Sequence, residues 1–306
     1  MQRVWGGIEG GGTRFRCLLG SGPAPADIVA EDSFPTTTPA ETLAAVAGFF
    51  VRHQAAYTIA GLGVACFGPV ELDPTSPRYG WITTTPKPGW TDTDVVGLLQ
   101  ARLGMPVAWE TDVNGALIGE HRWGAARGLR SAVYFTIGTG IGGGALVEGR
   151  PVHGLLHPEM GHIPIAALAG TDGPFAAGAC PYHGGGCLEG VASGLALAAR
   201  AGRPLATLPP DDPLWEDEAR YLAYAATVAT LLLSPQRIIF GGGVMLNQPR
   251  LFPLLRTHLL AQLNGYVRHP AITDDVATYL VPPLLGARAG VLGALALAMD
   301  ATGERR

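Results

Sequence analysis

One pattern decides the fold and occurs twice, as VWGGIEGGGTRFRCLL at residues 4–19 and as AVYFTIGTGIGGGALVE at residues 132–148. In both stretches a short apolar run predicts a buried strand, the glycines predict a tight turn, and the residues after them predict a second, antiparallel strand. The two copies lie about 130 residues apart. This repetition predicts two related α/β lobes, each of which presents a turn of backbone N–H groups to a common cleft.

The composition is that of a globular protein with many turns. The 306 residues include 44 Gly and 25 Pro, but 47% are hydrophobic, which is enough for a core and excludes disorder for the whole chain. The net charge is −4 and the basic residues form no run, so we expect no nucleic-acid partner. The most apolar stretches are shorter than the ~18 residues of a membrane span, and residues 1–7 lack an export signal, so we expect a cytoplasmic protein that binds no membrane.

Local signals predict the remaining elements. Three threonines at 36–38, followed by Pro39 and Glu41, predict the start of a helix over 39–54. Periodicity predicts further helices over 91–103, 112–123, 188–201, 214–233, 248–263 and 285–299, and further strands over 27–34, 60–67, 106–110 and 237–240. Five prolines fall in residues 68–90, a stretch long enough to indicate either a functional loop or disorder.

The glycine turns are candidate phosphate-binding loops. Residues 138–143 spell G-x-G-x-x-G, but a hairpin follows where a dinucleotide fold needs a helix, and no Walker-type loop is present. Turns of Gly and Thr can aim N–H groups and a hydroxyl at phosphate oxygens. Each turn alone could be a plain hairpin; two of them, with a third glycine run at 241–243, favour nucleotide binding. The candidate contacts in the two turns are Gly11, Gly12, Thr13, Thr139, Gly140 and Gly142.

Asp112 is the candidate general base. It lies where the strand predicted over 106–110 passes into the helix predicted over 112–123. Phosphoryl transfer to a sugar hydroxyl needs a carboxylate that orients the hydroxyl and accepts its proton, an electropositive cradle, and Mg²⁺ on the phosphates. The same position also suits a helix N-cap, and the two roles are compatible.

A metal site is predicted from a short loop. Cys180, His183 and Cys187 form a C-x₂-H-x₃-C pattern, and His162 upstream would complete a tetrahedral Cys₂His₂ set for zinc. A closed four-ligand site is usually structural. The alternatives are a surface histidine beside buried thiols, or His157 as a substitute ligand.

Jointly, these motifs resemble the ROK family of sugar kinases and, within it, the zinc-containing bacterial fructokinases. The resemblance spans nearly the whole chain in order. It is carried by GIEGGGT at 7–13, the fructokinase-like segment 67–90, ETDVNG at 110–115, the glycine turn 136–144, PEMGH at 158–162, the loop 180–190 and GGGV at 241–244.

The resemblance implies a duplicated actin/hexokinase-like (ribonuclease H-like) fold with the active site in a cleft between two lobes. It implies a small lobe over 1–115, joined by a C-terminal helix at about 287–306, and a large lobe over 116–286 that carries the zinc loop. The implied partners are ATP with Mg²⁺, a hexose and a second copy of the chain in a homodimer. It places Gly242 and Gly243 near the adenosine, and implies sugar contacts from Asn114, Glu159, His162 and Glu189.

Other interpretations stay open. Glu159 and Glu189 could be surface acids, and Asn114 a helix-start residue. The family motif often has Asp where this chain has Glu9, and Lys where it has Arg14, which keeps the charge but not the shape.

We expect fructose as the acceptor, with ATP-dependent formation of fructose 6-phosphate. The rivals are a kinase with broader or different hexose choice, such as mannose or glucose, and a non-catalytic sugar-sensing regulator. Regulators of the family resemble this core with an added N-terminal DNA-binding domain, and here the first motif already begins at Gly7, so we expect none.

Overall fold

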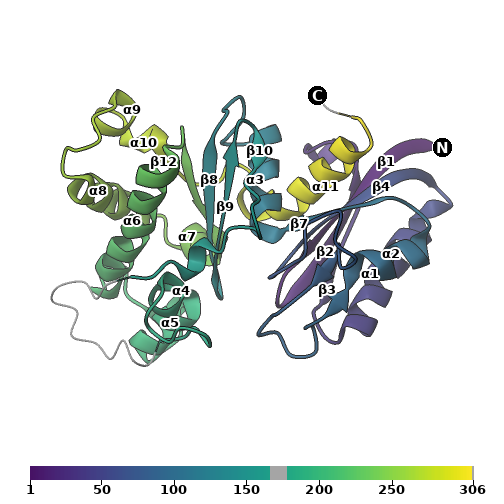
Figure 1. The fold of residues 1–306 in the computed structure, drawn as a ribbon, viewed down its shortest axis with the longest axis horizontal. Coiled ribbons are helices and arrows are strands. Elements are labelled where there is room, and N and C mark those ends of the chain that lie inside the picture. Colours follow the sequence, from purple (N-terminus) through teal and green to yellow (C-terminus); the bar gives the residue numbers. More distant parts are fainter. Residues whose placement is uncertain (166–177, 305–306) are drawn as a thin grey trace. The chain divides into compact units, whose positions relative to one another are not determined.

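The computed structural model describes residues 1–165 and 178–304. They form two compact units (Figure 1). The first unit comprises Met1–Gly128, Pro151–His157 and Arg288–Arg306, and the second comprises Leu129–Arg150 and Pro158–Ala287. Each contains one five-stranded sheet accompanied by helices, so the predicted α/β class is observed in both units.

The first sheet has the strand order β3-β2-β1-β4-β7. β1 (Gln2–Gly10) and β2 (Arg14–Gly20) form an antiparallel hairpin, and β3 (Ile28–Pro35) continues it antiparallel to β2. β4 (Tyr57–Cys66) and β7 (Val107–Thr111) follow in parallel on the other side of β1. Because β1, β4 and β7 are parallel, their carboxyl ends lie at one edge, where the first glycine turn and α3 begin.

The second sheet repeats this arrangement with the order β10-β9-β8-β11-β12. β8 (Ala132–Ile137) and β9 (Ile141–Val147) form the antiparallel hairpin, with β10 (Arg150–Pro151) beyond β9. β11 (Ile238–Gly241) and β12 (Leu280–Val281) are parallel to β8. The structure thus confirms that both quoted stretches are strand–turn–strand hairpins extended by parallel strands.

Capping residues set where the helices of the first unit begin. The Thr38 hydroxyl accepts a hydrogen bond from the Glu41 amide at 3.3 Å, at the predicted helix start. The next helix begins later than predicted, because the Asp94 carboxylate caps it by accepting the Gly97 amide at 2.7 Å. The helices are α1 (Pro39–Gln54), α2 (Val95–Leu103), α3 (Asp112–Trp123) and α11 (Ala289–Ala301).

Helices α3 and α11 pack with their backbones in contact. A Cβ on Gly293 would lie 1.7 Å from the carbonyl oxygen of Gly115, and a Cβ on Gly119 would lie 2.7 Å from that of Ala289. Only glycine fits such an approach. The predicted lobe boundary after residue 115 falls inside α3, whereas the structure keeps the whole of α3 in the first unit, where it packs on α11.

The helix predicted over 188–201 is two helices in the second unit. The chain is extended at Ser193, whose hydroxyl caps the second helix by accepting the Ala196 amide at 3.2 Å. The described helices are α4 (Leu188–Ala192), α5 (Gly194–Ala201), α6 (Leu214–Leu233), α7 (Gly242–Asn247), α8 (Leu251–Leu263), α9 (Pro270–Thr273) and α10 (Val276–Tyr279).

The proline-rich segment 68–90 is held at its carboxyl end by a buried tryptophan. Trp90 donates a hydrogen bond from Nε1 to the Thr37 carbonyl at 2.8 Å and stacks on Phe15 at 5.4 Å between ring centroids. A two-residue pairing of β5 (Trp81–Ile82) with β6 (Thr93–Asp94) closes the segment. The segment is therefore an ordered loop of the first unit.

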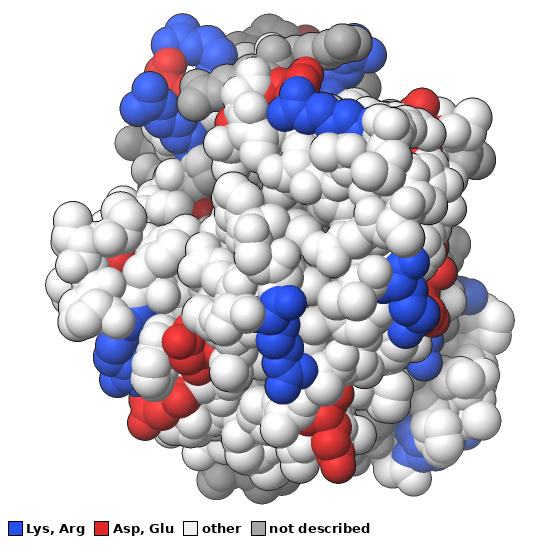
Figure 2. Space-filling view, turned by 90° about the vertical axis from the view of Figure 1, so that its right-hand side faces the viewer, with Lys and Arg blue, Asp and Glu red and all other residues white. Residues whose placement is uncertain are grey.

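One face of the molecule carries few charged side chains (Figure 2). On the face drawn in Figure 2, basic and acidic side chains are scattered over a largely uncharged surface and form no continuous basic area. Among the described residues, no helix combines the length and the apolar character needed to cross a membrane.

Candidate active site and metal centre

Asp112 is the first residue of α3 and follows directly on β7. The Thr111 hydroxyl caps the helix by accepting the Asn114 amide at 3.2 Å, so the Asp112 carboxylate is not the cap. Asp112 Oδ1 instead accepts the Val113 amide at 2.8 Å. Burial raises the pKa of Asp112 to about 6, against the opposing effect of backbone hydrogen bonds from Val113 and Asp112 itself. A carboxylate that ionises near neutral pH is suited to act as a general base.

A second perturbed carboxyl belongs to Glu9 on β1. Its side chain is 26% exposed, but the Oε2 atom is buried, lies 3.7 Å from Arg16 Nη1 and has no hydrogen-bond partner among the described residues. Burial raises the pKa of Glu9 to about 7; Arg16 opposes the shift and the charge of Asp112 adds to it. Asp112 and Glu9, both in the first unit, thus have pKa values close to neutral pH, and burial is the main cause.

Glu110, which precedes Asp112 by two residues, is a buried carboxylate at the centre of a hydrogen-bond network. Its Oε1 accepts hydrogen bonds from the Thr111 amide at 2.8 Å and from Asn114 Nδ2 at 3.0 Å. Its Oε2 lies 2.8 Å from His153 Nε2, and this hydrogen bond raises the pKa of His153. The Asn114 Oδ1 atom is buried without a hydrogen-bond partner in the described part of the chain. Glu110 and His153 are far apart in the chain and match no spacing rule, so no local sequence signal predicts this pair.

His157 is fixed to the first unit and not to the metal cluster. Its buried Nε2 atom accepts a hydrogen bond from the Val70 amide at 3.0 Å. The alternative in which His157 replaces a zinc ligand is therefore not observed. Instead, His157 holds the chain that leads to Glu159 against the amino end of the proline-rich segment.

The first glycine turn joins β1 to β2. The Gly11 amide donates to the Arg14 carbonyl at 3.0 Å, and the Thr36 hydroxyl donates to the Gly11 carbonyl at 2.7 Å. Gly12 and Thr13 are exposed at the tip. A Cβ on Gly12 would meet no described atom within 4 Å, so packing within this part of the chain does not require glycine there.

The second glycine turn meets the third glycine run. The Gly138 amide donates to the Gly140 carbonyl at 2.9 Å, and the Gly194 amide donates to the Gly138 carbonyl at 2.8 Å. Gly242 has a φ of 85°, and a Cβ on it would lie 2.5 Å from backbone atoms of Ile137. Both glycine runs therefore lie at the carboxyl end of β8.

The other predicted nucleotide contacts of the second unit lie at the same place. Thr139 and Gly243 are exposed, and Gly142 pairs with Thr136 in the hairpin. A Cβ on Gly243 would meet no described atom within 4 Å. The exposed residues of this region are therefore Thr139, which carries a hydroxyl, and Gly243.

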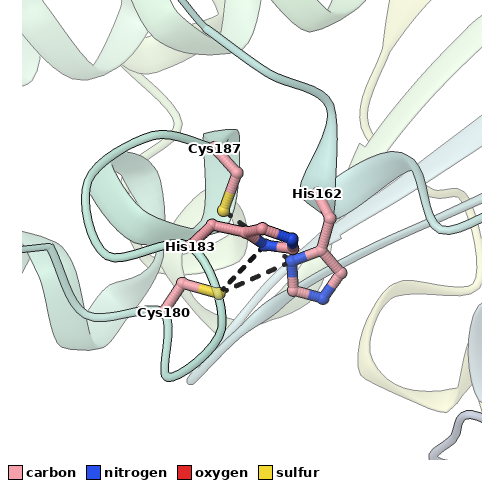
Figure 3. Close-up of side chains that lie close together, drawn as sticks. All are labelled: His162, Cys180, His183 and Cys187. Atoms are coloured by element: carbon pink, nitrogen blue, oxygen red, sulfur yellow. Dashed lines mark hydrogen bonds between the residues drawn. The ribbon is translucent and has the colours of Figure 1, made fainter.

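The structure brings the four predicted metal ligands together (Figure 3). Cys180 Sγ lies 3.6 Å from His162 Nδ1 and 3.5 Å from His183 Nδ1, and Cys187 Sγ lies 3.7 Å from His162 Nδ1. Zinc bonds of ~2.0–2.3 Å in a tetrahedron place neighbouring ligand atoms about 3.3–3.8 Å apart. These three separations match that geometry, all four ligand atoms lie within 4.8 Å of one another, and the two cysteines are buried. The donor set therefore fits zinc.

The two predicted acidic sugar contacts of the second unit have different surroundings. Glu159 is exposed, and its backbone carbonyl accepts the His162 amide at 2.9 Å, which places these two residues in one turn. Glu189 lies in α4, and its Oε2 accepts the Ile141 amide at 2.9 Å. Asn114, the remaining predicted contact, belongs to the first unit.

The profile of the ROK family matches residues 5–301. The chain belongs to the ROK family. Two relatives of this chain are named as fructokinases. The protein from Pediococcus pentosaceus is 42% identical over 97% of this chain and 98% of its own, and that from Zymomonas mobilis is 43% identical over 98% of each.

A solved ROK structure shares the fold. The ROK hexokinase from Thermus thermophilus superposes with a TM-score of 0.78 at 28% identity, covering 99% of this chain and 100% of that one. The predicted actin-like sugar-kinase fold is therefore confirmed, together with the membership in the ROK family that the motifs indicated.

Proposed function

We propose that this ROK protein transfers the γ-phosphoryl group of ATP to fructose and forms fructose 6-phosphate. The observation that carries the proposal is Asp112: a partly buried carboxylate with a pKa of about 6, at the start of a helix in a chain 42–43% identical to fructokinases along nearly its full length. A rival hexose acceptor, such as mannose or glucose, would use the same base.

In the proposed reaction, Asp112 accepts the proton of the sugar's primary hydroxyl as its oxygen bonds to the γ-phosphorus. The bond from that phosphorus to the bridging oxygen breaks, and ADP leaves. Mg²⁺ bound with ATP supplies positive charge to the phosphates. Asp112 is ionised above its pKa of about 6, so it is ready to accept a proton at neutral pH.

Two glycine turns are proposed to hold the nucleotide. The contacts are assigned to the backbone of Gly11, Gly12, Gly140 and Gly142, the hydroxyls of Thr13 and Thr139, and, near the adenosine, Gly242 and Gly243. Gly12 and Gly243 support this proposal. No described atom would lie within 4 Å of a Cβ at either position, so packing does not explain the glycine, and a nucleotide could approach the backbone closely there.

Sugar contacts are proposed from Asn114, Glu159, His162 and Glu189. Asn114 supports this role, because its buried Oδ1 atom lacks a hydrogen-bond partner among the described residues while its Nδ2 is held by Glu110. A fixed acceptor of this kind can take a hydrogen bond from a sugar hydroxyl.

The four-ligand cluster is proposed to bind one structural zinc. Cys180, His183 and Cys187 come from one short loop, and His162 comes from the turn that carries Glu159. Zinc bound there would fix that turn and the start of α4 to each other, and a closed ligand set leaves no open coordination position on the metal itself. The family resemblance also suggests a homodimer, which sedimentation of the purified protein would test.

A panel of hexoses with ATP in a coupled ADP assay tests the acceptor. Fructose should give the highest kcat/KM. If mannose or glucose exceeds it, the acceptor is wrong while the kinase assignment stands. If no sugar releases ADP but fructose still raises the melting temperature, the protein is a sugar sensor.

A further inference from the structure

The carboxylate of Glu189 lies on the second glycine turn. Its Oε2 accepts a hydrogen bond from the Ile141 amide at 2.9 Å. Glu189 belongs to α4, which begins immediately after the proposed zinc ligand Cys187. A residue proposed to contact sugar is therefore bonded to the turn proposed to contact nucleotide.

The turn is shaped around this carboxylate. A Cβ on Gly140 would lie 2.6 Å from Glu189 Oε2, closer than any ordinary contact. Gly140 is not among the glycines with positive φ, so its backbone conformation does not require glycine; a Cβ there would instead force the Glu189 carboxylate to shift. Glycine at this position makes room for Glu189.

A second bond holds the amino end of the same turn. The Gly194 amide, at the start of α5, donates to the Gly138 carbonyl at 2.8 Å. Short segments at 189 and 194 therefore fix both ends of the turn, while Thr139 between them is exposed. The Ile141 amide is occupied by the protein itself and is not free for a phosphate.

We propose that Glu189 is a positioning residue for the nucleotide: it holds the second glycine turn in its binding conformation before ATP arrives. The inference rests on the proposed nucleotide role of that turn. The hydrogen bond that Glu189 accepts from the Ile141 amide restrains the turn, and a loop ordered in advance loses less entropy on binding. The negative charge itself disfavours nearby phosphate, so the useful property is the acceptor oxygen and not the charge.

The test measures nucleotide binding without sugar, which separates this role from a sugar contact. Calorimetric titration with Mg²⁺ and the non-hydrolysable analogue AMPPNP should show that Glu189→Ala weakens binding about tenfold. Glu189→Gln keeps an acceptor oxygen and loses the charge, so its Kd should stay within about threefold of wild type or improve. Hydrogen exchange at the Ile141 amide should be faster in Glu189→Ala and unchanged in Glu189→Gln.

Gly140→Ala is a second way to break the hydrogen bond between Glu189 and the Ile141 amide, and it changes no residue of the zinc loop. Its Cβ would displace the carboxylate, so it should speed Ile141 amide exchange and weaken AMPPNP binding. In the double variant with Glu189→Ala it should add little, because both changes remove the same contact.

Equal AMPPNP affinity in wild type and Glu189→Ala would overturn the inference, as would full additivity in the double variant. Zinc content and melting temperature are measured on every variant. If Glu189→Ala loses zinc or unfolds, the test uses Gly140→Ala instead. A hydrogen-exchange rate of the Ile141 amide that is the same in Gly140→Ala as in wild type then overturns the inference. If wild type phosphorylates fructose and binds AMPPNP while these variants behave as wild type, the proposed function stands and the inference alone fails. If wild type does not bind AMPPNP, both fail.

Discussion

Replacing Asp112 with Asn is expected to lower turnover and raise stability at the same time. The pKa of Asp112 is raised from 3.8 to about 6 by burial. At 1.36 kcal/mol per unit, an ionised Asp112 lowers the free energy of unfolding by at most about 3 kcal/mol, and solvent screening at this partly exposed side chain reduces that to roughly 1.5 kcal/mol. Asn can still accept the Val113 amide, so the substitution removes the charge and little else.

The gain in stability depends on pH in a defined direction. The folded-state pKa is raised, so below pH 3.8 the carboxyl is protonated in both the folded and the unfolded state and does not lower the free energy of unfolding. The cost grows between pH 3.8 and about 6 and is constant above, where the folded protein carries the charge. Asp112→Asn should therefore gain roughly 1.5 kcal/mol at pH 8 and about a third of that at pH 4.5.

Urea unfolding at both pH values measures the gain, and the coupled ADP assay measures turnover. Loss of the base should lower kcat by about 10²–10⁴. Asp94→Asn is the matched control, because Asp94 also begins a helix but caps it by accepting the Gly97 amide, a role that Asn performs equally well. Turnover within tenfold of wild type would refute Asp112 as the base, and a loss of stability at pH 8 would refute the burial argument.

Three further predictions address the metal, the pH profile and the packing. Protein purified without added metal should contain about one zinc per chain, and Cys180→Ser should lose most of it; metal retained in full by that variant would exclude the ligand set. The value of kcat/KM should fall as pH drops through about 6, since Asp112 must be ionised to accept a proton; a flat profile between pH 5 and 7 would contradict this. Gly293→Ala should destabilise the folded protein by about 1–3 kcal/mol or more in a thermal melt, because its Cβ would lie 1.7 Å from the Gly115 carbonyl oxygen. Gly48→Ala is the control: its Cβ would come no closer than 3.7 Å to Arg52, so it should stabilise the folded protein by up to about 1 kcal/mol.

Local chemistry explains which elements could be predicted. Helices α1, α3 and α6 have the predicted ends, and α1 and α3 begin at side chains that cap them within a few residues, Thr38 and Thr111. The helix predicted over 188–201 is divided at Ser193, because the Gly194 amide bonds to Gly138, a partner far away in the chain. The two-residue strand β12 was missed, because its pairing with β11 carries no periodic signal.

By itself the sequence determined the doubled hairpin pattern, the four candidate metal ligands and the position of Asp112 between a strand and a helix. These depend on residue types and short spacings, which are read directly along the chain. Only the tertiary structure decided how strongly Asp112 is desolvated, that Glu110 joins Asn114 to His153, and that Glu189 bonds to the second glycine turn. Desolvation and hydrogen bonding depend on which distant segments surround a group in space, and no local pattern records that.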